Sequence, residues 1–238
     1  DNGALLNIEN DVPEQNDTEV EKTVHEDDLL TGNATGEGTK TVDATFTFAD
    51  LASLVDTGAD EPVTIALIGA GDAGDPTGTA VQRTGDGDDP ASASTLTSKG
   101  DTVWWYVDGG TGDVSGVTTT NNLAVQADGS NIDRTIFSIV PDGNDFDVAL
   151  SDQIDNIEPT TPGEPGDGDT DQIDLAIAFV ATDYDDDSLQ LDNGALLNIE
   201  NDVPEQNDTE VEKTVHEDDL LTGNATGEGT KTVDATFT

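Results

Sequence analysis

The sequence of 238 residues contains neither cysteine nor methionine, and it is poor in positive charge and in long apolar runs. Without cysteine, disulfides, thiol catalysis and zinc sites built on thiolates are excluded. No run approaches the ~18 apolar residues of a membrane span, and the first residues lack the charged-then-apolar pattern of a signal peptide. Because residue 1 lies in the middle of a sequence pattern, we expect the chain to be a fragment. The absence of a targeting segment from these residues then says little about where the protein is located.

The charge balance is strongly one-sided. The chain has 53 acidic and 7 basic side chains, for a formal net charge of -46, so salt bridges cannot neutralise it. Screening in physiological salt acts over only ~8 Å, and clustered carboxylates therefore repel one another. This argues against nucleic acid and anionic membrane surfaces as partners, because both would be repelled. We expect folding to depend on metal cations or on a salty environment.

A long internal repeat dominates the organisation. Residues 1–47 and 192–238 are identical at all 47 positions, with an offset of 191 residues. Long repeats of this kind indicate a tandem array, in which copy number matters more than any one site. The expected partners are neighbouring identical repeats in the same chain, with no small-molecule substrate. The alternative is an artificial duplication of one piece.

Apolar and polar residues alternate with period two along most of the repeat, which predicts β-strands. The pattern is clearest in residues 41–48, and it recurs in residues 63–68, 103–107, 134–140, 146–150 and 174–180. Turn-rich segments of Gly, Asp, Asn and Pro separate these strands. Only residues 48–55 are typical of a short helix. We predict an all-β fold, most simply β-sandwiches of antiparallel strands.

Two turn-rich segments, residues 56–62 and 158–171, indicate boundaries within the repeat. We therefore predict one sandwich inserted into another, with two sandwiches in simple succession as the alternative. The predicted division is 1–17 as the end of a preceding repeat and linker, 18–55 with 170–201 as the outer split sandwich, 56–169 as the inserted sandwich with its linkers, and 202–238 as a linker and the start of the next repeat.

The segment "DYDDD" follows a strand and places carboxylates at Asp183, Asp185 and Asp187. Spacing by two in a tight loop lets alternate side chains converge on Ca²⁺, which takes 6–8 oxygen ligands at roughly 2.3–2.6 Å. The loop is no EF-hand, because Ser188 and Gly194 stand where that motif needs glycine and glutamate. A solvated acidic turn is the alternative to a calcium site.

A second acidic set surrounds the repeat joint. We expect calcium to bridge carboxylates that leave one unit and carboxylates that begin the next, with a flexible acidic linker as the alternative. The candidates are Glu9, Asp11, Glu14, Glu26, Asp27 and Asp28, with their repeated copies Glu200, Asp202, Glu205, Glu217, Asp218 and Asp219. His25 lies among them, and we predict a solvated or capping role for it, since one histidine among acids makes neither a triad nor a two-histidine metal site.

Both tryptophans lie in "VWWYV". Alternation predicts that Trp105 faces one side and that Trp104 and Tyr106 face the other, so at least one ring should lie in a core. An exposed aromatic side chain would instead stack on a sugar ring.

The segments "TVHEDDL", "TLTSKGDTVWWYVDG", "IDLAIAFVATDYDDDSL" and "IENDVPE", in this order, resemble the extender repeats of giant bacterial RTX adhesins, the biofilm-forming proteins exported by type I secretion. The resemblance implies Ig-like sandwiches strung end to end outside the cell, on the bacterial surface, with calcium at their joints. Such repeats hold a ligand-binding tip away from the cell. The acidic loop of that family reads D-x-D-G-D, whereas Asp186 replaces the glycine here.

The predicted function is that of a structural spacer repeat of a cell-surface adhesin, rigidified by calcium. One alternative is a module that itself binds a saccharide or a surface, and this alternative requires an exposed aromatic patch. Another is a surface-layer protein of a halophile, whose acids hold water and salt. We do not expect an enzyme, because no nucleophile, base and orienting group converge in the sequence.

Overall fold

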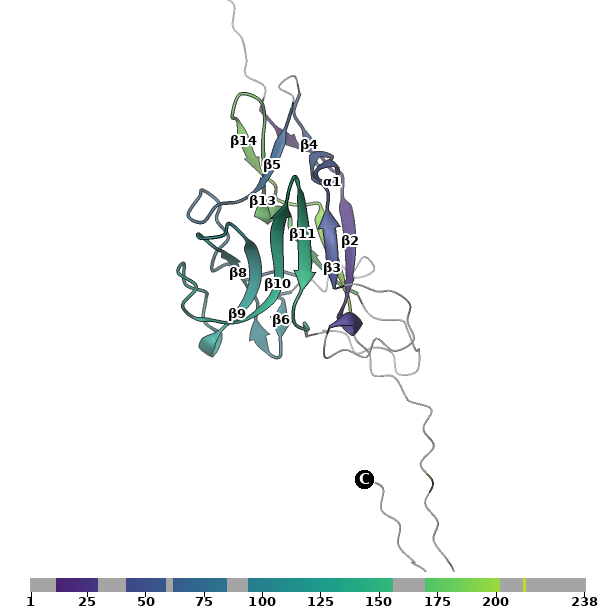
Figure 1. Ribbon diagram of the computed structural model, residues 1–238, viewed down its shortest axis with the longest axis vertical. Helices are drawn as coiled ribbons and strands as arrows, with labels where there is room; N and C mark the ends of the chain where they lie inside the picture. The colour runs from purple at the N-terminus through teal and green to yellow at the C-terminus, as the bar shows by residue number, and fades with distance from the viewer. Residues whose placement is uncertain are drawn as a thin grey trace, which may run out of the picture. The chain divides into compact units, whose positions relative to one another are not determined.

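The computed structural model describes residues 12–29, 42–58, 62–84, 94–155 and 170–201, together with residue 212. Apart from residue 212, these residues belong to one compact unit, Asp1–Pro204. The unit consists mainly of β-strands in several sheets, with a few short helical turns (Figure 1). This confirms the predicted all-β sandwich class. Within the described ranges no helix is long and apolar enough to cross a membrane.

The largest sheet has five strands in the order β3-β11-β10-β9-β8, and every pair in it is antiparallel. Its strands are β3 (Asp43–Phe46), β11 (Asp145–Leu150), β10 (Ile132–Asp142), β9 (Val114–Thr119) and β8 (Trp104–Val107). A tight turn connects β10 to β11, and Gly143 adopts a φ of 67° in it. Glycine suits this position because a side chain strains the left-handed backbone.

Two smaller sheets have three strands each. The first has the order β12-β15-β2, and the second has the order β14-β13-β5. Their strands are β12 (Thr170–Asp174), β15 (Ala195–Glu200), β2 (Val20–His25), β14 (Ser188–Gln190), β13 (Phe179–Thr182) and β5 (Thr64–Leu67). Strands β15 and β2 run parallel, which is an exception to the predicted antiparallel pairing.

The remaining elements are short. Two pairs of two-residue strands flank the main sheets, β1 (Glu14–Gln15) with β4 (Val55–Asp56) and β6 (Thr97–Ser98) with β7 (Asp101–Thr102). The helical segments are α1 (Phe48–Ala52) and the 3-10 turns η1 (Glu26–Asp28), η3 (Thr120–Asn122) and η4 (Ala176–Ala178). Helix α1 confirms the one predicted helix, although it ends earlier than residue 55. A capping box starts it, because Thr47 and Asp50 each accept a backbone N–H from the other.

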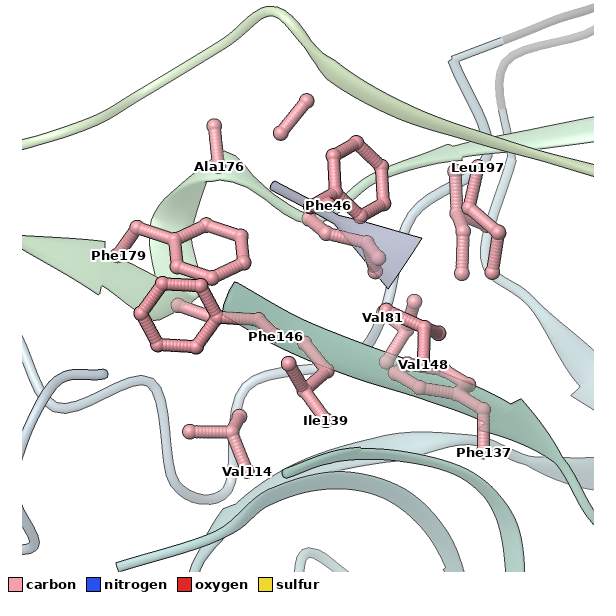
Figure 2. Packing of buried hydrophobic residues seen from close by; sticks show 14 of the residues in the cluster. Phe46, Val81, Val114, Phe137, Ile139, Phe146, Val148, Ala176, Phe179 and Leu197 are labelled. Atoms are coloured by element: carbon pink, nitrogen blue, oxygen red, sulfur yellow. The ribbon is translucent and has the colours of Figure 1, made fainter. Parts of the chain in front are cut away.

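One continuous core joins the five-stranded sheet to the two smaller sheets (Figure 2). Its centre holds Phe46 of β3, Phe146 of β11 and Phe179 of β13. The ring centroid of Phe179 lies 5.1 Å from that of Phe146 and 6.4 Å from that of Phe46. Trp105 packs edge-on against Phe137 at 5.4 Å and is 3% exposed, which confirms the prediction of a tryptophan in the core.

The predicted strand over residues 174–180 is wrong in its middle. Strand β12 ends at Asp174, η4 follows, and β13 begins at Phe179. The Asp174 carboxylate accepts the N–H of Ala176 at 2.9 Å and so starts the 3-10 turn. A side chain that binds a nearby backbone amide competes with the strand ladder. The turn carries the chain from the sheet of β12 to the sheet of β13.

The predicted split into an outer and an inserted sandwich is not shown by these residues. Strand β3 belongs to the predicted outer piece, yet it pairs with β11 of the predicted insert. Strand β13 of the outer piece likewise pairs with β5 of the insert. In addition, Glu14 and Gln15 form β1 within the unit, although the sequence placed them in a linker. The two pieces therefore share sheets as well as the core.

The first strand of the unit and the end of its last strand lie at opposite ends of it. The Gln15 side chain of β1 donates to the backbone carbonyl of Asn193 at 2.5 Å, just before β15 begins. The end of β15 pairs with the end of β2, where His25 contacts Glu200. In Figure 1, β4 and the β13–β14 hairpin lie at the upper end and the purple turn η1 lies at the lower end. We call these the β1 end and the η1 end.

We predict that Phe179→Ala lowers the free energy of unfolding by about 3–5 kcal/mol, because it empties the centre of the shared core. Tryptophan fluorescence reports the five-stranded sheet and far-ultraviolet circular dichroism reports all sheets, so urea unfolding should shift both to the same new midpoint. Leu123→Ala is the control, since Leu123 is 62% exposed. An unchanged fluorescence midpoint would show that the five-stranded sheet unfolds separately.

Candidate metal centre

The β13–β14 hairpin builds the acidic loop. Thr182 and Ser188 are the last paired residues of the two strands, and residues 183–187 form the turn between them. Two hydrogen bonds close the loop. The N–H of Asp183 donates to the carbonyl of Asp187 at 3.0 Å, and the N–H of Asp187 donates to Asp183 Oδ1 at 2.9 Å. These bonds fix the backbone so that alternate side chains converge.

The structure brings together Asp183, Asp185 and Asp187, as the sequence predicted. One carboxylate oxygen from each lies within 4.8 Å of the others, and this is the only such group within the described ranges. Asp183 is buried, Asp187 is half-buried and Asp185 is exposed. Asp183 is 5% exposed, and its buried Oδ2 has no hydrogen-bond partner. Leaving such an acceptor unsatisfied costs roughly 1–3 kcal/mol, and more for a charged group.

The other buried acid provides a contrast. Glu26 is 3% exposed, and its Oε1 accepts the N–H of Ile154 at 2.5 Å. Its charge lies near Arg83, which is also 3% exposed and pairs with Asp171 at 3.0 Å. Burial lowers the pKa of Arg83, and the charges of Asp171, Asp155 and Glu26 oppose that shift. Glu26 is therefore stabilised by the protein itself, whereas Asp183 has one carboxylate oxygen, Oδ2, that no protein group satisfies.

Three convergent carboxylates with one unsatisfied oxygen can hold a metal ion. Oxygen-only ligands favour hard cations such as Ca²⁺ and Mg²⁺ over softer transition metals. A cation at this position would give Asp183 Oδ2 the opposite charge that the protein does not supply. It would also offset the mutual repulsion of the three carboxylates, which strengthens as they are buried. The arrangement itself does not select one hard cation over the others.

Asp186 shows how the loop closes without glycine. Its φ is 72°, in the left-handed region that favours glycine. Aspartate enters this region more readily than most residues, though at some cost in strain. The loop thus keeps the backbone turn that a glycine would give. Its three converging carboxylates belong to Asp183, Asp185 and Asp187.

The joint candidates that the structure describes form no group of metal-ligating residues. Glu14 lies in β1, whereas Glu26, Asp28 and Glu200 lie at the η1 end. Five strand steps of ~3.3 Å, the length of β2, separate the two ends of that strand. Asp28 Oδ2 is buried without a hydrogen bond, but Asp28 joins no group of three metal-ligating residues in the described part of the chain.

His25 was predicted to be solvated or capping, and the structure gives it another role. Its side chain makes no capping hydrogen bond at the start of η1. Instead, Nδ1 lies 2.6 Å from Oε2 of Glu200, and both side chains are half-buried. This contact joins the ends of the parallel strands β2 and β15.

Several predicted ligands lie outside what the structure describes. Asp27 belongs to η1, but its side chain is not described. The other candidates outside the described residues are Glu9, Asp11, Asp202, Glu205, Glu217, Asp218 and Asp219. For these the calcium assignment stays a prediction.

Sequence reasoning missed how the fold holds many of its other carboxylates. Backbone amides do this: Asp155 accepts from Lys99 and Gly100, each at 2.7 Å, and Asp108 accepts from Gly110 at 2.7 Å. Asp174 accepts three N–H groups, yet burial raises the pKa of its carboxyl. An Asp two residues before Gly, as in "DGG", is the local signal for such turns. The long-range bonds to Asp155 have no sequence signal.

We predict different outcomes for two substitutions at Asp186. Asp186→Gly should raise the free energy of unfolding by about 0.5–1 kcal/mol, because it relieves the left-handed strain. Asp186→Ala removes the same charge but keeps a Cβ in that conformation, so it should give no such gain. Thermal unfolding of both variants compares them directly. Equal stability of the two would mean that residue 186 is not strained.

A second prediction separates Glu26 from a metal role. Glu26→Gln keeps an acceptor for Ile154 but removes a negative charge beside buried Arg83, and it should cost about 1–3 kcal/mol. The loss should be the same with and without a metal chelator, as measured by chemical unfolding. Glu21→Gln, at an exposed position of β2, is the matched control. A loss that vanishes under chelation would make Glu26 a metal ligand.

The chain matches no known protein family, no curated protein and no solved structure.

Proposed function

We propose that the chain is a structural spacer repeat of a bacterial cell-surface adhesin, working outside the cell and rigidified by calcium. The observation that carries the proposal is that β1 lies at one end of the unit and that β15 runs from there to the η1 end. In a sequence that repeats every 191 residues, such a unit advances the chain along its length with each copy. The adhesin context rests on the motif resemblance.

Calcium is the cation that the proposal assigns to Asp183, Asp185 and Asp187. Calcium accepts irregular oxygen coordination, whereas Mg²⁺ demands a near-ideal octahedron and retains its waters. Calcium sites of extracellular modules commonly have dissociation constants of ~10⁻⁴–10⁻³ M. They therefore stay empty in the cytosol and fill outside, where binding stabilises the folded state.

The two alternative functions have less support. A saccharide-binding module needs an exposed aromatic patch, but in the described ranges Trp105 is buried and Tyr184 is the single exposed aromatic side chain, at 76%. A halophile surface protein uses its acids to hold water and salt. The buried Asp183 Oδ2 favours a bound cation over surface hydration.

Calcium binding is tested by terbium luminescence, because Tb³⁺ replaces Ca²⁺ and Tyr184 can sensitise it from within the loop. We predict terbium emission that calcium displaces and that Asp183→Asn abolishes. The matched control is Asp142→Asn, an exposed aspartate of β10, which should retain the emission. Emission retained in Asp183→Asn would exclude this site.

Thermal unfolding measures how much bound calcium stabilises the unit. Calcium at about 100 times its dissociation constant should stabilise the unit by ~2.7 kcal/mol, or about 5–10 °C for a domain of this size. In chelator, Asp183→Asn should be at least as stable as the parent, since it removes like-charge repulsion. If high monovalent salt stabilises the unit as well as calcium does, the halophile alternative is favoured.

The spacer role is tested by X-ray scattering of chains with one, two and three copies of the 191-residue period in calcium. The maximum dimension should grow by a constant increment with each added copy. Growth that follows the weak length dependence of a compact globule would contradict a spacer.

A further inference from the structure

Strands β2 and β15 run side by side and parallel over their whole length. Six residue pairs join them, from Val20 with Ala195 to His25 with Glu200. Among the residues that the structure describes, β15 is the one strand that pairs with β2, whereas β15 also pairs with β12 on its other side. The ladder with β15 is therefore the sheet pairing that holds β2 to the rest of the unit.

The chain reaches this ladder at one end and leaves it at the other. Strand β1 lies at the start of the ladder, because Gln15 is bonded at Asn193, and β2 runs from there to the η1 end (Figure 1). In the array of the proposed function, only residues 201–204 separate the end of β15 from the repeated copy of the β1 sequence. Each copy is thus joined to its neighbours at the start of β2 and at the end of β15.

Tension along such an array pulls the two strands in opposite directions along their own axes. The start of β2 is drawn toward the preceding copy, and the end of β15 is drawn toward the next one. Because the hydrogen bonds of a parallel ladder are evenly spaced along both strands, all of them carry the load together. Strands pulled apart from one shared end would instead lose their pairs one at a time.

Side chains fasten the ladder at both ends. At its start, the Gln15 side chain donates to the carbonyl of Asn193 at 2.5 Å and accepts the N–H of Asp192 at 2.9 Å. At its other end, Nδ1 of His25 lies 2.6 Å from Oε2 of Glu200. Each contact links the β2 side of the ladder to the β15 side, so sliding one strand along the other breaks both.

Strand β2 is also anchored to the elements beside it. Val24 is completely buried in the core. The Nζ of Lys22 lies 2.8 Å from Oδ2 of Asp50 in α1 and 5.9 Å from the ring centroid of Phe46 in β3. These are short-range contacts, so a slip of one strand step, ~3.3 Å, is enough to lose them. They oppose the same sliding motion as the ladder.

We propose that the ladder of β2 and β15 is a shear clamp, through which the unit bears tension applied between residues 12 and 201. The direction of the load rests on the proposed spacer role, but the function is a further one, because the unit then resists force as well as spanning distance. No residue of the clamp belongs to the loop of residues 183–187. The resistance therefore comes from the pairing of the strands and not from an ion in that loop.

Single-molecule force spectroscopy tests the clamp by changing the direction of pulling. The sequence has no cysteine, so Val12→Cys with Asn201→Cys places handles at opposite ends of the ladder in the full chain. Val12→Cys with Asp192→Cys places both handles at its start. In calcium and at one loading rate, the first pair should require the higher unfolding force, because it alone loads the ladder in shear. Equal forces, or a higher force for the second pair, overturn the proposal.

A matched pair of proline substitutions tests the ladder itself. The N–H of Val20 donates to the carbonyl of Gly194 at 2.8 Å, and the next N–H along the strand, that of Glu21, points to the opposite side. Proline is tolerated at the first residue of a strand and where the N–H of an edge strand faces away from its partner. Val20→Pro should lower the unfolding force between residues 12 and 201, and Glu21→Pro should retain it. Equal forces in the two variants count against the clamp.

The outcome is separable from that of the proposed function. Terbium emission tests calcium in the loop of residues 183–187, and scattering of chains with several copies tests the spacing, whereas force spectroscopy of one copy reports the ladder. A force that depends on direction, found without terbium binding, would keep the clamp and remove the calcium site. Terbium binding and regular spacing, found with equal forces in both directions, would keep the spacer and remove the clamp.

Discussion

The fold depends on how a chain with almost no positive charge brings carboxylates out of water. Within the described residues two acids are buried, Glu26 and Asp183. Glu26 is satisfied by a backbone amide and lies near Arg83, whose own burial is matched by Asp171. Asp183 has one oxygen that is satisfied and one that is not. A buried carboxylate oxygen without a partner is unfavourable, and this oxygen belongs to the one group of described residues that can hold a metal ion.

The architecture places the unsatisfied oxygen of Asp183 at one end of the unit. The aromatic core formed by β3, β11 and β13 fixes the base of the hairpin, and the hairpin carries Asp183 to the β1 end of the unit. The buried network of Arg83 lies elsewhere, linking η1, β12 and the segment that follows β11. The ion pair of Arg83 thus lies apart from the loop of residues 183–187, whose three carboxylates can hold a metal ion. The parallel pairing of β15 with β2 then sets where the chain leaves.

Sequence patterns predicted those parts of the fold that local chemistry determines. Strands with one solvated face, such as β3 and β11, follow from alternation, whereas β9 is buried on both faces from Gly116 to Thr119 and shows no such period. The spacing of Asp183, Asp185 and Asp187 predicted their convergence. The unsatisfied oxygen of Asp183 and the burial of Arg83 depend on packing between distant strands, so no local pattern indicates them. The predicted strand over residues 174–180 failed because a side-chain bond of Asp174 competes with the ladder.

The repeated sequence has a defined structural role in one of its two copies. Residues 192–200 complete the sheet as β15, and the same nine residues stand at positions 1–9. The calcium assignment does not depend on the repeated residues, since Asp183, Asp185 and Asp187 all lie in one hairpin. Anomalous diffraction from crystals grown with terbium tests the central claim most directly. The account predicts a peak between the three carboxylates, at about 2.3–2.6 Å from Asp183 Oδ2. No peak, with Asp183 Oδ2 bonded instead to a protein donor or to water, would contradict it.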